Sequence, residues 1–151
     1  MLLLQANPVS ALLNSYEWVF PGSEIFHIVG FGVAIGTIAL VDFSLLGVGL
    51  HRKGTQQLLK NTAPWTLTAL VIVILAGLIL FLTDPVHYLE NPSFQFKITC
   101  LVLAILFNYT IHRKVALSET VSAPASALVA IISLALWVSV VFGGLFIAFV
   151  A

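Results

Sequence analysis

Four long apolar stretches, separated by short polar segments, dominate the pattern along the chain. They run from about residue 23 to 50, 64 to 83, 93 to 110 and 124 to 150. A helix needs roughly 20 mostly apolar residues to cross a bilayer, and each stretch is close to that length. The pattern therefore predicts an all-α fold, a bundle of four transmembrane helices that forms a single domain over residues 1–151.

Residues that favour turns and helix ends lie between these stretches. Pro21-Gly22 predicts a turn before the first span, and Asp84-Pro85 predicts the end of the second. Pro124 opens the fourth, because proline is tolerated in the first turn of a helix.

A shorter amphipathic segment precedes the first span. Asn7 followed by Pro8 is typical of a helix start. Apolar side chains then recur at helical spacing on one face: Val9, Leu12, Leu13, Tyr16, Val19 and Phe20. We expect a short helix over about residues 8–20. It either lies in the membrane interface or packs on the mouth of the bundle.

The basic residues predict the orientation. Five of the six lie in the connections between the first and second spans and between the third and fourth: Arg52, Lys53, Lys60, Arg113 and Lys114. Lys97 alone lies on the opposite side. By the positive-inside rule these two connections face the cytoplasm, so both ends of the chain are expected outside.

The composition agrees with a multi-pass protein of the membrane. Hydrophobic residues make up 60% of the chain and charged residues only 8%, against about 25% in soluble domains. The formal net charge is zero, which argues against nucleic acid as a partner because phosphate binding needs excess Lys and Arg. There is one cysteine and no C-x-x-C-H motif, so any haem would be bound non-covalently.

Four histidines carry the main chemical signal. His27 and His87 are expected near the outer face, and paired histidines from membrane helices are typical ligands of b-type haem. Haem also needs space, and small residues such as Gly30, Gly143 and Gly144 lie at the depth of His27. We therefore predict an outer haem site with His27 and His87 as the metal ligands. The alternative is that the glycines serve close helix packing.

A second pair, His51 and His112, is expected near the inner face. Arg52 and Arg113 follow these histidines and could pair with haem propionates. The alternative is that all four are cations that satisfy helix C-termini and meet anionic lipid. One haem b is expected rather than two.

Two acidic residues complete the candidate site. Asp42 lies inside the first span, where a carboxylate is costly and is therefore a candidate for function. It could transfer a proton, bond a polar ligand such as a quinone, or fasten the bundle. Glu24 lies three residues before His27 on the same helical face and could orient that histidine.

The segment Trp18-Val-Phe-Pro21-Gly-Ser-Glu24-Ile-Phe-His27-Ile-Val-Gly30, with Asp42 and Leu45-Leu46-Gly47 after it, resembles an uncharacterised family of short bacterial four-helix membrane proteins. The resemblance spans most of the chain and implies a place in the bacterial cytoplasmic membrane. The four-helix plan is also similar to membrane-embedded b-type cytochromes, an analogy of architecture that does not fix function.

Three functions are compatible with these features. The leading hypothesis is a small b-type cytochrome that carries electrons between a periplasmic redox protein and the membrane, with a membrane quinone as a further partner. The second is a cofactor-free structural or assembly subunit of a membrane complex. The third is a proton- or cation-coupled transport protein that uses Asp42, for which an oligomer could complete the path.

Overall fold

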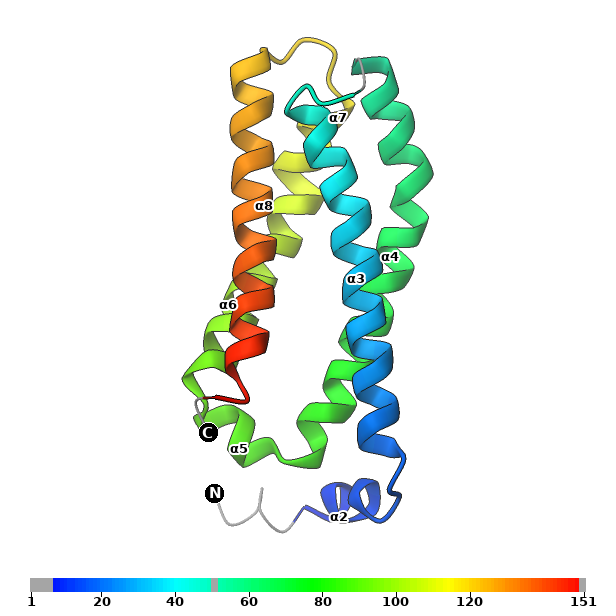
Figure 1. The fold of residues 1–151 in the computed structure, drawn as a ribbon, viewed down its shortest axis with the longest axis vertical. Helices are drawn as coiled ribbons and strands as arrows, with labels where there is room; N and C mark the ends of the chain where they lie inside the picture. Colours follow the sequence, from blue (N-terminus) through cyan, green and yellow to red (C-terminus); the bar gives the residue numbers. More distant parts are fainter. Residues whose placement is uncertain (1–6, 50–51, 150–151) are drawn as a thin grey trace.

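The computed structural model describes residues 7–49 and 52–149, and within them all regular structure is helical (Figure 1). The elements are α2 (Pro8–Asn14), α3 (Val19–Leu45), α4 (Arg52–Thr83), α5 (Pro85–Glu90), α6 (Pro92–Phe107), the π-helical turn η1 (Asn108–His112), α7 (Arg113–Leu117) and α8 (Ala123–Phe146). Four helices in this described part are long and apolar enough to cross a membrane, counting α6, η1 and α7 as one. The predicted four-helix, all-α architecture is confirmed.

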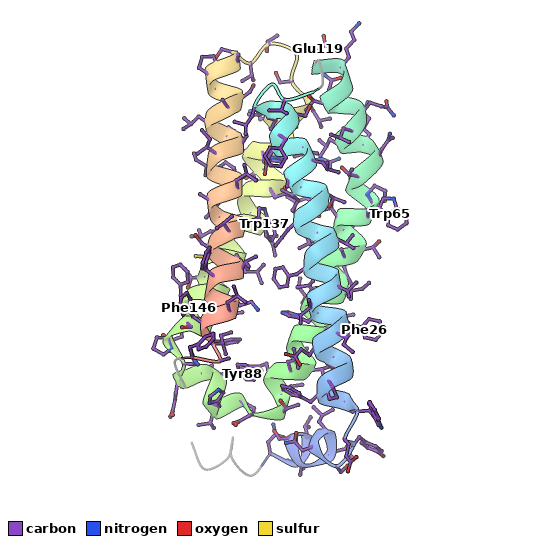
Figure 2. The ribbon with its side chains drawn as sticks, in the orientation of Figure 1. Phe26, Trp65, Tyr88, Glu119, Trp137 and Phe146 are labelled. Carbon is purple, nitrogen blue, oxygen red and sulfur yellow. The ribbon has the colours of Figure 1, made fainter. Side chains whose placement is uncertain are left out.

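The bundle is built from two helix pairs. α3 packs mainly on α4 and α6 packs on α8, while contacts between α3 and α8 join the pairs. Small side chains such as Ala34, Ala69 and Ala104 fill the centre and allow the backbones to approach. Trp137 is the largest fully buried side chain and points into the bundle from α8 (Figure 2).

The outer surface of the bundle is apolar. Phe26 and Trp65 project away from the helices, and each is about two-thirds exposed (Figure 2). Many other leucine, isoleucine and valine side chains on the four long helices are also exposed. Because a water-soluble protein rarely exposes so continuous an apolar surface, the four helices are expected to face lipid.

The described ends of the chain lie at one end of the bundle. α2 and α5 are found there, and the connections α3–α4 and α7–α8 lie at the opposite end (Figure 1). We call the end near Lys53, Arg113 and Lys114 the inner end and the other the outer end, after the orientation that the sequence predicts.

The first span differs from its predicted limits of 23–50 at both ends. α3 begins at Val19, so Pro21 and Gly22 lie inside its first turn, where a proline costs no hydrogen bond. It ends at Leu45 because Gly47, at φ 85°, forms a Schellman motif. In this motif the Gly47 N–H donates to the Ser44 carbonyl (3.1 Å) and the Val48 N–H to the Phe43 carbonyl (3.0 Å).

The second span is longer than the predicted 64–83. α4 begins at Arg52, and Pro64 lies inside it instead of opening it. The residues before the proline are mostly good helix formers such as Gln, Leu and Lys, so the helix extends beyond the apolar stretch. The predicted stop is confirmed, because α4 ends at Thr83 and the Asp84 side chain caps α5.

The third span, predicted as 93–110, continues through η1 and α7 to Leu117. The polar residues near its inner end do not stop the helix, and two of them, Asn108 and His112, are buried. The fourth, predicted as 124–150, runs from Ala123 to Phe146.

The N-terminal helix is shorter than the predicted 8–20. α2 ends at Asn14, although the Asn7 cap and Pro8 at its start are as expected. It packs on the outer end of α4, where the Ser10 hydroxyl donates to the Leu82 carbonyl (2.7 Å) and the Asn14 amide to the Thr83 carbonyl (3.1 Å). These are among the last carbonyls of α4, which have no partner within their own helix. α2 therefore caps the mouth of the bundle.

Candidate functional site

Asp42 is fully buried in the last turn of α3 and bonds to two other spans. Its Oδ1 lies 2.6 Å from Nε2 of His112 on η1. Its Oδ2 accepts a hydrogen bond of 2.8 Å from the Ser133 hydroxyl on α8. Both carboxylate oxygens are therefore satisfied inside the bundle, as a buried acid requires. We call Asp42, His112 and Ser133 the inner cluster.

His112 is as deeply buried as its partner, with 1% of its surface exposed. Its Nε2 faces the carboxylate of Asp42, so this nitrogen carries the proton that the carboxylate accepts. Its Nδ1 is also buried, and among the described residues it has no hydrogen-bond partner. An unpaired buried polar atom is costly and often marks a place where water, an ion or a ligand binds.

The π-helical turn η1 places this histidine. Five residues, Asn108–His112, form the wide turn between α6 and α7. Asn108 and His112 are both buried, whereas Tyr109, Thr110 and Ile111 are exposed. Such turns are rare and are often found at functional sites.

A pocket adjoins the inner cluster between α3, α4 and η1. Its cavity volume is about 20 Å³, room for about one water molecule, and it is partly open to the outside. The lining residues are Thr37, Ile38, Val41, Leu59, Thr62, Ala63, Thr66, Asn108, Tyr109, His112 and Arg113. The hydroxyls of Thr37 and Thr66 bond to each other at 2.8 Å, which links α3 and α4 along one wall. The pocket thus combines apolar walls with a few polar groups.

At the outer end, His27 makes two contacts across the bundle. Its Nδ1 lies 2.9 Å from the Val73 carbonyl on α4, and its Nε2 lies 3.2 Å from the Lys97 ammonium on α6. A carbonyl oxygen only accepts, so Nδ1 carries the proton. Nε2 then accepts from Lys97, whose Nζ also lies 5.1 Å from the centre of the Phe31 ring. We call His27, Lys97 and Phe31 the outer cluster.

The glycines at this depth accommodate protein side chains. A Cβ on Gly77 would lie 2.9 Å from Cε1 of His27, and a Cβ on Gly143 would lie 3.0 Å from Cβ of Lys97. A Cβ on Gly144 would lie 3.3 Å from Nζ of Lys97. These three glycines thus leave room for the side chains of the outer cluster. Gly30 packs closely on Val73 of α4.

His87 does not join His27. It lies exposed on α5, where its ring packs against Tyr88 with centroids 5.6 Å apart. The pairing of His27 and His87 at a haem therefore stays a prediction. Among the described residues no group of three or more His, Cys, Asp or Glu side chains could hold a metal ion.

Glu24 is exposed, and its charge acts on Tyr88 of α5. Burial is the main cause that raises the pKa of the Tyr88 hydroxyl, and the negative charges of Glu24 and Asp84 add to it. Both ring nitrogens of His27 contact groups other than Glu24. The predicted role of Glu24 in orienting His27 therefore stays a prediction.

The predicted inner pair is described only in part. His51 and the side chain of Arg52 lie outside the described residues. His112 and Arg113 both line the pocket. The bond between Asp42 and His112 was missed by the sequence analysis, which gave the acid a possible fastening role without naming His112 as its partner. Ser44, two residues after Asp42, bonds to Thr55 of α4.

Four membrane-spanning helices with a buried acid–histidine pair define a small multi-pass membrane protein. The chain belongs to the family of unknown function DUF6644, whose sequence model matches residues 14–150. This agrees with the resemblance seen in the sequence. No curated protein and no solved structure matches the chain.

Proposed function

We propose that the protein is a proton-coupled membrane transport protein in which the Asp42–His112 pair binds and releases the proton. The observation that carries this proposal is the contact of 2.6 Å between two ionisable side chains that are both fully buried in a spanning bundle. Ionisable residues inside a membrane are expensive to keep and usually serve a proton or ion pathway.

The pair has the chemistry for reversible proton binding. One proton can reside on the histidine, giving an ion pair, or on the carboxylate, giving two neutral groups, and the total charge is the same. A further proton makes the pair cationic, and loss of a proton makes it anionic. Because Nε2 faces Asp42, Nδ1 is the ring atom that remains for exchange with the surroundings.

In this proposal the proton reaches the pair from the inner end through the pocket. His112 and Arg113 both line it, and Arg113 is exposed at the start of α7. The outer cluster lies in the other half of the bundle. His27 and Asp42 are fifteen residues apart on α3, which corresponds to ~22 Å at ~1.5 Å per residue. Complete transfer therefore requires a conformational change or a path completed by a second copy of the chain.

Proton flux into liposomes tests this proposal. Purified protein is reconstituted with pyranine inside the vesicles, and valinomycin with a potassium gradient drives proton entry. We expect Asp42→Asn to reduce the flux at least about tenfold, a change of about 1.4 kcal/mol in the barrier. Glu119→Gln makes the same acid-to-amide change at an exposed residue and should leave the flux unchanged. Equal flux in wild type and Asp42→Asn would overturn the proposal.

A b-type cytochrome is the second candidate function, and the unpaired Nδ1 of His112 is the observation that favours it. Such a cytochrome of the bacterial cytoplasmic membrane would exchange electrons with a periplasmic redox protein or a quinone. Visible spectra of oxidised and dithionite-reduced protein, with a pyridine haemochrome assay, test for haem b. A colourless protein from haem-supplemented cells would exclude this function. If proton flux is also absent, the subunit or assembly-factor hypothesis gains support.

A further inference from the structure

We propose that Lys97 and His27 form a second proton-binding site, in the outer half of the bundle, that exchanges protons with the outer side of the membrane. The exchange across the membrane rests on the proposed function, whereas proton binding by the two residues rests on their own contacts. Because the ligand is a proton, the site requires no cavity.

Lys97 is a basic side chain inside the bundle with few partners. Its Nζ lies 3.2 Å from Nε2 of His27, the one hydrogen-bond acceptor that the described residues offer it. The centre of the Phe31 ring is 5.1 Å away. An ammonium has three N–H donors, and no carboxylate among the described residues pairs with this one. A charge so weakly compensated is costly within a span, where ionisable side chains usually serve a functional pathway.

His27 presents one ring nitrogen to Lys97 and keeps the other bonded. Its Nδ1–H donates to the Val73 carbonyl at 2.9 Å, and this bond forms whether or not Nε2 is protonated. Nε2 is therefore the ring atom that can take a proton from Lys97. A Cβ on Gly77 would lie 2.9 Å from Cε1 of the ring, so α4 packs directly against His27 and holds its orientation.

Two bases joined by one hydrogen bond can hold an added proton at either end of that bond. With the proton on Lys97, the ammonium donates to Nε2 of His27; with the proton on His27, Nε2–H donates to the neutral amine. After the proton leaves, an N–H of the amine still donates to Nε2. Two adjacent cations repel each other, so the pair takes up one proton and not two. The site therefore gains and loses a proton without losing the contact between α3 and α6.

The surroundings favour a proton over a metal cation. Hard cations such as Mg²⁺ and Ca²⁺ take oxygen ligands, whereas the two atoms that face each other here are nitrogens. The other ionisable residues of the outer half are Tyr16, Glu17, Glu24, Asp84, His87, Tyr88, Glu90 and Cys100. All carboxylates among them are exposed, and the described part of α8 contributes no ionisable side chain.

The two clusters are separated by apolar core. Ala34 and Ile38 lie between His27 and Asp42 on α3, and both are buried. On the spans of α6 and α8, the buried Ala104 and Trp137 likewise lie between the residues of the outer and inner clusters. We therefore assign proton exchange with the outer side to Lys97 and His27, and exchange with the inner side to the Asp42–His112 pair.

NMR of labelled lysine and histidine tests the site directly. Protein with ¹⁵N-lysine and ¹⁵N-histidine is titrated with acid and base in nanodiscs, and signals are assigned by their loss in Lys97→Met and His27→Gln. We expect one pH step that moves the Lys97 Nζ and His27 Nε2 signals together. This step should lie apart from that of the exposed Lys53, Lys60 and Lys114. A Lys97 signal that follows the exposed lysines, or a His27 signal that does not move with it, would overturn the inference.

Lys97→Arg separates proton exchange from charge. Arginine keeps the positive charge and can donate to Nε2, but it does not release its proton in proteins. In the liposome assay we expect this variant to lower the flux at least about tenfold, whereas a merely structural pair would tolerate the arginine. Lys53→Met removes an exposed lysine and should leave the flux unchanged. Wild-type flux in Lys97→Arg would contradict the assigned exchange.

His27→Gln covers the case in which Lys97→Arg does not fold. A glutamine amide can donate to Val73 and accept from Lys97, but it does not titrate. This variant should move the pH step of Lys97, and an unchanged step would count against the site. The NMR titration requires no transport, so it stands apart from the proposed function. A flux that survives Asp42→Asn but is lost in Lys97→Arg would refute the role of the inner pair and support this site.

Discussion

Asp42 and His112 lie 70 positions apart in the sequence, and their side chains meet at 2.6 Å inside the bundle. The contact joins the last turn of α3 to the π-helical turn after α6, and Ser133 adds α8 to the same carboxylate. Three of the four spans are thus tied together at one point near the inner end. The remaining span, α4, forms the far wall of the adjoining pocket.

Substitution of one partner of the Asp42–His112 pair should destabilise the protein more than substitution of both. His112→Ala leaves the Asp42 carboxylate buried with Ser133 as its remaining described partner, and the loss of one partner of a buried pair costs about 3 to 5 kcal/mol. We expect the double variant Asp42→Leu/His112→Phe to be less destabilised than either single variant. Ser133→Ala should cost only about 1 kcal/mol.

Unfolding in mixed micelles of increasing SDS content measures these free energies. A double-mutant cycle over Asp42 and His112 then gives the coupling energy between them. Additive effects of the two single substitutions would show that the buried contact contributes nothing to stability.

Gly77 and Gly32 should respond to alanine in opposite ways. A Cβ on Gly77 would lie 2.9 Å from the His27 ring, so Gly77→Ala must displace the ring from its contact with Lys97. Overpacking of this kind costs about 1 to 3 kcal/mol. A Cβ on Gly32 would meet nothing within 4 Å, so Gly32→Ala should stabilise α3 by about 0.5 to 1 kcal/mol.

Thermal unfolding of both variants in the same detergent gives the comparison. If Gly77→Ala is as stable as the wild type, the close packing of His27 on α4 is not a feature of the folded protein.

The sequence analysis predicted the four spans because a run of roughly twenty apolar residues is typical of a transmembrane helix. It placed span ends less well. The end of α3 depends on the left-handed backbone of Gly47, and the start of α4 depends on a polar helix that continues the apolar one. Neither is visible in a hydropathy pattern. The π-turn that buries His112 had no signal in the sequence either.

The candidate residues were found more easily than their partners. Asp42 and His27 stood out because ionisable groups inside a span are rare. Their contacts depend on helix rotation and pairing, which one sequence does not reveal. A signal existed for Asp42, since a buried acid needs a partner and His112 was the histidine expected near the inner end of another span. Lys97 served only to assign the orientation, and its contact with His27 was not predicted.

The orientation is open to a direct labelling test. In a Cys100→Ser background, Glu90→Cys on α5 should react with a membrane-impermeant maleimide added to intact bacterial spheroplasts. Glu119→Cys in the connection between α7 and α8 should react only after permeabilisation, because the positive-inside rule places it in the cytoplasm. Both positions are exposed, so access to the reagent depends on the side of the membrane. The reverse labelling pattern would invert the assigned inner and outer ends.

Tyr88 should ionise at a higher pH than a free tyrosine. Burial raises the pKa of its hydroxyl, and the charges of Glu24 and Asp84 raise it further, above the ordinary value of about 10. The protonated, neutral form is the one favoured in the folded protein. The corresponding contribution to stability is therefore fully present below the unfolded pKa and is lost as the pH rises through the folded one.

Absorbance at 295 nm during an alkaline titration resolves this ionisation. The phase that disappears in Tyr88→Phe belongs to Tyr88, and we expect it to move to lower pH in Glu24→Gln because one negative charge is removed. Tyr16→Phe serves as the control, since Tyr16 is 63% exposed and its substitution should leave this phase in place. If Glu24→Gln leaves the phase where it was, then the charge of Glu24 does not act on Tyr88.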